Sequence, residues 1–326
     1  MIKKIGLVLT LLLTFVSTTF SADKILRIGY PGTNALLPGV AGLAQDKKFI
    51  DEELKKIGYK AEYKPFAAAG PAVNEALATK AIDVAIYADF PGLVSKSKGV
   101  PHTLVGIYDN FVNAALIVSK DSPIKSIKEL KGKKIGFIKG TYLHKVLFQL
   151  LELNGLKPTD VQLINTVDGE ASLIGKTIDA YVTTDTSEAL AIVSKKFAKT
   201  IDSTNKHPQF AGQGVIVARD EYLQDNSNAI VALDKALIRA KALWVKTPEV
   251  GYKSLVKSGQ DLASIKYIYA KDKGKFNYVT LRVNDASIKK LQDTVSWLLD
   301  NELIKKGFDV KAWTNNSYYD KAAKAK

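Results

Sequence analysis

Residues 134–155 read KIGFIKGTYLHKVLFQLLELNG, a short apolar run that passes directly into an amphipathic stretch. The apolar residues between 135 and 138 are typical of a buried strand. From Leu143 onward the apolar positions recur at helical spacing and form one face. Thr141 is a favourable N-cap residue, and Gly155 is a favourable C-terminal stop. The stretch therefore predicts a strand, a tight turn and a helix, as in an α/β protein.

The turn at Lys139, Gly140 and Thr141 has two interpretations. The first N–H groups of a helix are unpaired and lie at the positive end of its dipole, so the turn could bind a negatively charged ligand. Many turns of this kind connect a strand to a helix and bind nothing. The stretch by itself leaves both interpretations open.

The first 21 residues, MIKKIGLVLTLLLTFVSTTFS, have the three parts of a secretory signal peptide. Lys3 and Lys4 form its basic start, residues 5–16 are an apolar core too short to span a bilayer comfortably, and small residues precede a predicted cleavage after Ser21. The chain has no Cys, which excludes disulfides, thiolate metal sites and a lipoprotein anchor. We expect a soluble periplasmic product that lacks residues 1–21.

The chain is basic, with 47 Lys and Arg against 33 Asp and Glu and a formal net charge of +14. The basic residues are scattered through predicted helices such as residues 235–246, and no basic run alternates with aromatic residues. We interpret the excess as a solvated lysine-rich surface that mildly attracts anionic ligands or membrane surfaces, and we expect no nucleic-acid partner.

Strands and helices alternate along the chain, and the two halves share short sequences. IGYPGT at residues 28–33 is similar to IGFIKGT at 135–141, and LATKAIDVAIYAD at 77–89 is similar to LIGKTIDAYVTTD at 173–185. The common order predicts two lobes of similar design, each with an open α/β sheet. Chance similarity between short apolar strands is the alternative, because the matches are far shorter than true repeats.

Ligands of open α/β sheets bind beyond the C-terminal ends of the strands. Helix starts at Thr33, Asp89, Thr141 and Asp185 all follow such ends, so we expect them to converge on one cleft between the lobes. The convergence favours a small ligand with a negative group.

The mature chain resembles the periplasmic solute-binding proteins of ABC importers for sulfonates, taurine and nitrate. The segments that carry this resemblance are LRIGY, DSPIKSIKELKGKKIGFIKGTYLH, GLKPTDVQ, IDAYVTTD and the C-terminal LLDNELIKKGFDVKAW. The resemblance implies an α/β, two-lobed periplasmic-binding-protein fold of type II, with a ligand cleft between the lobes and two hinge segments. It also implies a monomer that captures a small anion or zwitterion, needs no cofactor and delivers its ligand to an ABC permease in the inner membrane.

The resemblance further implies which loops line the cleft. The residues concerned are Gly32, Thr33, Asn34, Phe66, Ala69, Gly70, Tyr87, Ala88, Asp89, Gly140, Thr141, Tyr142, Thr184 and Asp185. The Trp, Pro and Tyr that the family carries in its last turn are missing at residues 184–187, which leaves the identity of the ligand open.

Two polar segments, near residues 106–114 and 207–217, are the predicted hinge crossings. They add Asn110, Asn113 and Gln213 to the candidate ligand-binding residues. The predicted lobe 1 comprises residues 22–108 and 212–326, and the predicted lobe 2 comprises residues 109–211. The C-terminal third would then return to lobe 1 as helices.

The candidate loops contain none of the four Arg residues, so no guanidinium clamp is predicted. The available donors are backbone N–H groups and neutral side chains such as Thr33, Asn34, Thr141 and Tyr142. Asp89 and Asp185 are expected to be N-caps; if either instead faced the cleft, it would favour a zwitterion that carries an ammonium group.

An enzyme is disfavoured, because the chain has no G-x-S-x-G, P-loop or H-E-x-x-H motif. His102, His144 and His207 lack the spacing of metal ligands, so we expect no metal site. Some enzymes of pyrimidine and menaquinone biosynthesis share this architecture, so the fold alone does not exclude catalysis. The alternatives are a secreted sensor subunit and a binding protein for a heterocyclic vitamin precursor.

Overall fold

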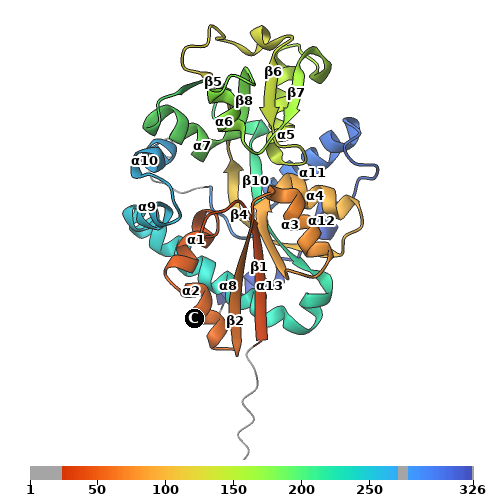
Figure 1. Cartoon of the computed structure of the whole chain (residues 1–326). Coiled ribbons are helices and arrows are strands. Elements are labelled where there is room, and N and C mark those ends of the chain that lie inside the picture. Colours follow the sequence, from red (N-terminus) through yellow and green to blue (C-terminus); the bar gives the residue numbers. More distant parts are fainter. Residues whose placement is uncertain (1–23, 271–277, 325–326) are drawn as a thin grey trace, which may run out of the picture.

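The computed structural model describes residues 24–270 and 278–324. The predicted signal peptide lies outside these residues. Two α/β lobes follow one another along the long axis of the molecule, each around its own five-stranded sheet (Figure 1). Among the described residues, none of the helices combines the length and the apolar character that a membrane crossing requires.

The first sheet has the strand order β2-β1-β3-β10-β4. β1 runs parallel to β2 and β3, whereas β10 is antiparallel to β3 and β4. Its strands are β1 (Lys24–Pro31), β2 (Tyr59–Phe66), β3 (Val84–Ala88), β4 (His102–Val112) and β10 (Gly212–Arg219).

The second sheet has the order β7-β6-β8-β5-β9, in which β6 is parallel to β7 and β8 while β5 is antiparallel to β8 and β9. Its strands are β5 (Ala114–Ser119), β6 (Lys134–Phe137), β7 (Gln162–Asn165), β8 (Ala180–Thr184) and β9 (Ala198–Ser203). The two sheets match strand for strand, with β1 in the place of β6 and β3 in the place of β8. The predicted similarity of the two lobes is therefore confirmed.

Helices cover both sheets. Those with the second sheet are α5 (Tyr142–Leu153), α6 (Gly169–Ile174) and α7 (Asp185–Ala189), which continues into the π-helical turn η3 (Leu190–Ser194). Single 3₁₀ turns are η1 (Ile127–Leu130), η2 (Pro158–Asp160) and η4 (Pro208–Phe210). The strand β6, the turn and the helix α5 confirm the unit predicted from residues 134–155.

The helices that accompany the first sheet come from both ends of the chain. They are α1 (Gly39–Asp46), α2 (Phe49–Lys55), α3 (Ala69–Ala78), α4 (Asp89–Ser97), α8 (Asp220–Lys246), α9 (Pro248–Lys257), α10 (Leu262–Ala270), α11 (Asp285–Asp300), α12 (Val310–Trp313) and α13 (Ser317–Lys324). The long helix α8 packs against α1, α2 and α13, so the last third of the chain returns to the first sheet as expected.

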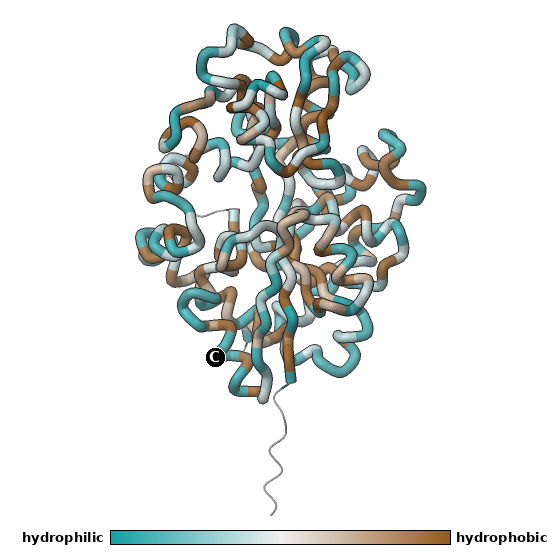
Figure 2. Tube along the Cα trace, viewed as in Figure 1, coloured by the Kyte–Doolittle hydropathy of each residue, from teal (hydrophilic) through white to brown (hydrophobic). Residues whose placement is uncertain are grey.

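The apolar core extends through both lobes. One cluster of buried side chains includes Ala85 and Leu104 of the first sheet together with Leu116 and Ile135 of the second. Figure 2 shows apolar residues concentrated along the central strands and hydrophilic residues on the outer turns. Trp244 and Trp313 are buried in the core.

Candidate functional site

The starts of α3, α4 and α5 meet where the two sheets face each other. A side chain on Gly140, whose φ is +79°, would come within 3.3 Å of Pro71 in α3. A side chain on Gly212 would lie 3.1 Å from the Asp89 carboxylate and 3.4 Å from the Tyr142 ring. Two of the four predicted helix starts, those at Asp89 and Thr141, therefore converge here together with the start of α3, and buried side chains fill the space between them. The predicted helix start at Thr33 is wrong, because an irregular turn follows β1 and α1 begins only at Gly39.

Asp89 is completely buried at this junction. Its Oδ1 accepts a hydrogen bond from the Phe90 N–H at 2.8 Å, and its Oδ2 lies 3.8 Å from the ammonium nitrogen of Lys145 in α5. Lys145 is 2% exposed and donates to the Thr294 hydroxyl of α11 at 3.3 Å. A charged pair thus connects the two lobes.

The predicted capping roles need correction. Asp89 and Asp185 are the first helical residues, and the N-caps are Ala88 and Thr184, because the extended strand conformation ends one residue earlier than expected. The Thr184 hydroxyl makes the cap by accepting from the Ser187 N–H at 3.1 Å.

Thr141 is the N-cap residue of α5, as predicted, but its side chain does not cap the helix. Its hydroxyl instead donates to the Ile138 carbonyl at 2.8 Å. The neighbouring Tyr142 donates to the Asn113 carbonyl at 3.1 Å. Burial, and then the nearby Asp185, raise the pKa of the Tyr142 hydroxyl well above its usual value.

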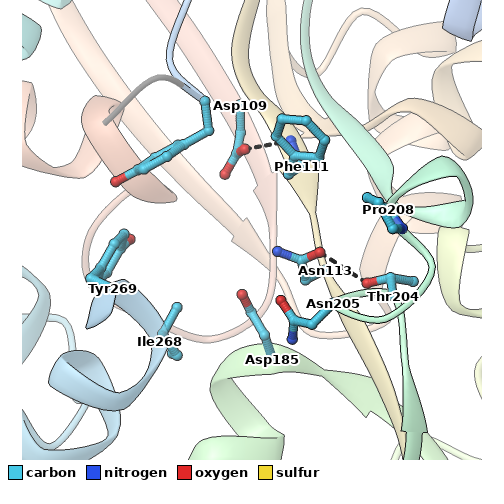
Figure 3. A pocket seen from close by; sticks show the side chains of 10 residues that line it. Asp109, Phe111, Asn113, Asp185, Thr204, Asn205, Pro208, Ile268 and Tyr269 are labelled. Atoms are coloured by element: carbon cyan, nitrogen blue, oxygen red, sulfur yellow. Dashed lines mark hydrogen bonds between the residues drawn. The ribbon is translucent and has the colours of Figure 1, made fainter. Parts of the chain in front are cut away.

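A cavity of about 240 Å³ lies beside this junction, where the chain crosses between the sheets. Its wall is formed by the crossing from β4 to β5, the segment after β9, the start of α7 and the end of α10 (Figure 3). Its lining residues are Asp109, Phe111, Asn113, Asp185, Thr204, Asn205, Pro208, Ile268, Tyr269 and Tyr278.

Backbone hydrogen bonds orient the two carboxylates of this cavity. Asp109 Oδ1 accepts from the Phe111 N–H at 2.8 Å, and Asp185 Oδ1 accepts from the Thr186 N–H at 2.7 Å. The carboxyl groups of Asp109 and Asp185 point toward the middle of the cavity from opposite sides (Figure 3).

Neutral groups form a second part of the wall. Thr204 donates to the side-chain oxygen of Asn113 at 2.9 Å, which leaves the amide nitrogen of Asn113 directed into the cavity (Figure 3). Asn113 can therefore donate a hydrogen bond to a ligand.

Aromatic rings close the cavity on the side of α10. The ring centroid of Tyr269 lies 5.9 Å from that of Tyr278 and 5.6 Å from that of Tyr252, against which it stacks. Burial raises the pKa of Tyr269 well above its usual value, and the charges of Asp109 and Asp185 raise it further.

The structure divides the predicted ligand-binding residues into groups. Asn113 and Asp185 line the cavity. The residues around the junction of α3, α4 and α5 are Ala69, Gly70, Tyr87, Ala88, Asp89, Gly140, Thr141 and Tyr142. Gly32, Thr33 and Asn34 lie in the turn after β1, where the Gly32 N–H donates to the carbonyl of Phe66 at 2.8 Å. Tyr142 connects the junction to the cavity through Asn113.

Two predicted hinge residues lie behind the cavity. The buried Gln213 side chain approaches Asn110 Oδ1 at 3.5 Å. Lys290 donates to the Asn110 carbonyl at 3.1 Å. Burial lowers the pKa of Lys290 to about 8.

Eight lining residues were not predicted. Asp109 and Phe111 lie inside the predicted first hinge, but neither is a neutral hydrogen-bond donor like the Asn residues predicted there. Tyr269 and Tyr278 come from the C-terminal third and have no local pattern that places them near residue 113. The remaining ones are Thr204, Asn205, Pro208 and Ile268.

The Arg residues form ion pairs with acidic side chains outside the cavity. Arg27 and Arg219 pair with Asp83. Arg239 pairs with Glu52 and Glu53, and Arg282 pairs with Asp320. Within residues 24–270 and 278–324, no Lys or Arg side chain lines the cavity.

The three His residues occupy separate places. His102 approaches the Ser95 hydroxyl at 2.7 Å, His144 packs against Phe148, and His207 lies beside Asp202. The part of the chain that the structure describes contains no group of three acidic or His side chains placed to hold a metal.

Comparisons with known proteins place these features in a family. The model of a family described as NMT1/THI5 like matches residues 55–250. A protein of Escherichia coli (strain K12), named as an aliphatic sulfonates-binding protein, is 25% identical over 303 residues, which cover 91% of each chain.

A solved structure and an enzyme are also similar. The alkanesulfonate-binding protein SsuA of Xanthomonas axonopodis pv. citri, solved bound to MOPS, has a TM-score of 0.78 at 21% identity and covers 91% of this chain and 100% of its own. A 4-amino-5-hydroxymethyl-2-methylpyrimidine phosphate synthase of Legionella pneumophila is 29% identical over 92 residues, which are 28% of this chain and 29% of the enzyme. The two-lobed fold is that of periplasmic binding proteins.

Proposed function

The chain belongs to the NMT1/THI5-like family, and from that premise we propose that it is the extracytoplasmic solute-binding protein of an ABC importer. One observation carries the proposal: a cavity lies between two lobes of matching topology, at the place where the chain crosses from one to the other. Periplasmic binding proteins close two such lobes around a ligand by bending at the crossings.

The proposed lobes comprise residues 22–108 with 212–326, and residues 109–211. Strand β4 leads into β5 at residue 113, and β9 leads into β10 through residues 204–211, so two chain segments would serve as hinges. We propose a monomer that is secreted to the periplasm and docks on a permease of the inner membrane.

The names of the sulfonate-binding relatives favour a small organic sulfonate, and the proposed ligand class is a small anion or zwitterion of the sulfonate, taurine or nitrate type. A cavity of about 240 Å³ suits a small molecule. The absence of a catalytic motif from the sequence favours binding without turnover, although one protein with a similar segment is a synthase.

Small-angle X-ray scattering tests the proposal. The purified mature chain is titrated with ethanesulfonate, taurine and nitrate and then with a broader library of small solutes. The radius of gyration should fall at saturation with at least one solute. Asn205→Trp, which fills the cavity from an exposed position on its rim, is the control and should abolish the change.

A second measurement separates import from sensing. Cells that lack the protein should lose uptake of the compacting solute, labelled with a radioisotope, and should regain it on complementation. An unchanged radius of gyration with every member of the library would reject a solute-binding role. If a solute compacts the protein but its uptake is normal in the deletion strain, the result would favour a role as a sensor subunit.

A further inference from the structure

Strand β4 contains a β-bulge where it borders the cavity. In its pairing with β10, Asp109 lies opposite Gly214 and Val112 lies opposite Gly212, so two residues of β4 oppose one residue of β10. A bulge of this kind takes backbone groups of the extra residue out of the hydrogen-bond ladder. Such groups need other partners in the folded protein.

The C-terminal part of the chain supplies these partners at Asn110. The Asn110 N–H donates to the carbonyl of Tyr278 at 2.7 Å. The ammonium nitrogen of Lys290 in α11 donates to the Asn110 carbonyl at 3.1 Å. The Ser287 hydroxyl, one turn earlier on the same helix, donates to the side-chain oxygen of Asn110 at 3.2 Å. Helix α11 therefore holds the bulge through two side chains.

Lys290 also interacts with the two neighbours of Asn110, both of which line the cavity. Its ammonium nitrogen lies 4.9 Å from the centre of the Phe111 ring, within the range of a cation–π interaction. Phe111 is 45% exposed, so packing encloses its ring only in part. The negative charge of Asp109 acts on the ammonium group as well. One ammonium group outside the cavity thus interacts with three consecutive residues, two of which form the cavity wall.

We propose that Lys290 is a positioning residue of the cavity: its ammonium group holds the bulged segment 109–111, so that Asp109 and Phe111 keep the places from which they meet a ligand. The proposal rests on the proposed function, because it concerns the ligand of the same cavity. Lys290 acts on that ligand through the segment, since it lies behind the wall that the segment forms.

The charge of Lys290 depends on pH in a range that is accessible to experiment. Burial lowers the pKa of Lys290 to about 8. The charged groups that face it are Asp89 on α4, Lys145 on α5 and Asp109 on β4; the two carboxylates raise this pKa, and the Lys145 ammonium lowers it. The neutral amine that forms above about pH 8 loses the cation–π interaction and the attraction to Asp109. We therefore expect the segment to loosen as the pH rises through this value.

Fluorine NMR tests the role of Lys290 without any ligand. 4-Fluorophenylalanine is incorporated in place of Phe111 in the mature chain, and its resonance is followed between about pH 6.5 and pH 10. We expect one titration step with a midpoint near pH 8, because the ring lies beside the charge that titrates. Lys290→Met should remove the step, and Lys290→Arg should also show a constant resonance, because a guanidinium stays charged over this range. Lys289→Met removes an exposed charge at the neighbouring position and should titrate as wild type does.

Isothermal titration calorimetry with ethanesulfonate, whose charge is constant over this range, connects the step to binding. The wild-type affinity should fall by up to about tenfold between pH 7 and pH 9, the change that corresponds to one unit of pKa. Lys290→Met should bind about tenfold more weakly at pH 7, because the charge-assisted hydrogen bond to the segment is lost, and should show no such pH dependence. Lys290→Arg should bind as wild type does at pH 7 and keep that affinity at pH 9. Lys289→Met should follow wild type at both pH values.

A fluorine step that is identical in wild type and Lys290→Met, or absent from wild type, would overturn the inference. Equal affinities of wild type and Lys290→Met at both pH values would overturn it as well. If scattering selects another member of the solute library, that solute replaces ethanesulfonate in the calorimetry. Failure of the proposed function gives a different result: wild type then binds no member of the library, and the fluorine step alone decides whether Lys290 holds the segment.

Discussion

Lys145 of α5 and Asp89 of α4 form an ion pair between the two lobes, with 3.8 Å between Nζ and Oδ2 and exposures of 2% and 0%. The distance is too long for a direct hydrogen bond, so the attraction is coulombic, and Thr294 accepts one ammonium hydrogen. Phe90 follows Asp89 and Leu143 lies on the helix of Lys145, and both belong to one buried apolar cluster. This side of the interface therefore combines a continuous core with two buried charges.

Removal of one partner of the pair should destabilise the protein strongly. Lys145→Met leaves the Asp89 carboxylate buried without its cation and should lower the free energy of unfolding by about 3–5 kcal/mol. Urea denaturation measures the change. The double variant Lys145→Met with Asp89→Asn should lose less than the sum of the single variants, because no lone charge remains.

Lys289→Met is the control for this experiment. Lys289 pairs with Asp293 on the exposed face of α11, and loss of such a surface pair should change stability by at most about 1 kcal/mol. Equal changes in the free energy of unfolding for Lys145→Met and Lys289→Met would show that the buried pair contributes no more to stability than a surface pair.

The lobes also meet through polar contacts at α10, on the other side of the crossing strands (Figure 1). The Ser194 hydroxyl of η3 donates to Asp261 at 2.6 Å and lies 3.1 Å from the Ser264 hydroxyl. Exposed hydrogen bonds separate more easily than a shared apolar core, so we expect the lobes to open here and to pivot near Lys145.

Ser194→Ala should therefore favour the open form. Loss of one hydrogen bond of about 1 kcal/mol corresponds to roughly fivefold faster release of a bound solute, with little change in the association rate. Stopped-flow fluorescence measures both rates. Ser296→Ala, which removes an exposed hydroxyl bonded within its own helix, is the matched control. Slower association with unchanged release would contradict an opening at this contact.

The sequence pattern predicts the order of elements well, because periodicity and turn residues are local. The similar segments 28–33 and 135–141 include the ends of β1 and β6. The other similar pair, 77–89 and 173–185, includes β3 and β8. Both pairs of strands occupy equivalent positions in the two sheets. The starts of α4 and α7 differ from prediction by one residue. Such shifts depend on how far a strand stays extended before its helix begins.

The cavity is harder to predict because packing between distant segments forms it. Tyr142 and Phe90 are large enough to fill the space where the helix starts meet, so the open volume lies beside them. Tyr269 enters the site only because α10 packs against α7 and η3. No local periodicity in the sequence predicts that contact between helices.

Thr141→Ala separates the two interpretations of the turn at Gly140. The Thr141 hydroxyl bonds the Ile138 carbonyl, and Thr141 does not line the cavity. The substitution should lower the free energy of unfolding by about 1 kcal/mol, the usual value of one hydrogen bond, and leave ligand affinity within twofold. Parallel denaturation and calorimetry measure both. A tenfold loss of ligand affinity with unchanged stability would indicate that the turn contacts the ligand.

Acidification should destabilise the protein through two buried His residues. Burial lowers the pKa of His102 to about 3 and that of His144 to about 4, with smaller contributions from Lys96 and Lys139 respectively. Between the unfolded value of about 6.5 and these values, the unfolded chain binds protons that the folded chain does not. Stability is therefore fully present above about pH 6.5 and falls as the pH decreases, by up to about 1.4 kcal/mol per unit for each residue.

His144→Leu tests this linkage. The ring of His144 packs between Phe137 and Phe148, and none of the described residues forms a hydrogen bond with its Nδ1. A leucine fits the apolar surroundings and cannot take up a proton, so the stability of the variant relative to wild type should rise steadily from pH 6.5 to pH 4. Measurements above pH 7 give the packing cost alone and serve as the internal control. A difference between variant and wild type that stays constant across this range would show that His144 does not contribute to acid sensitivity.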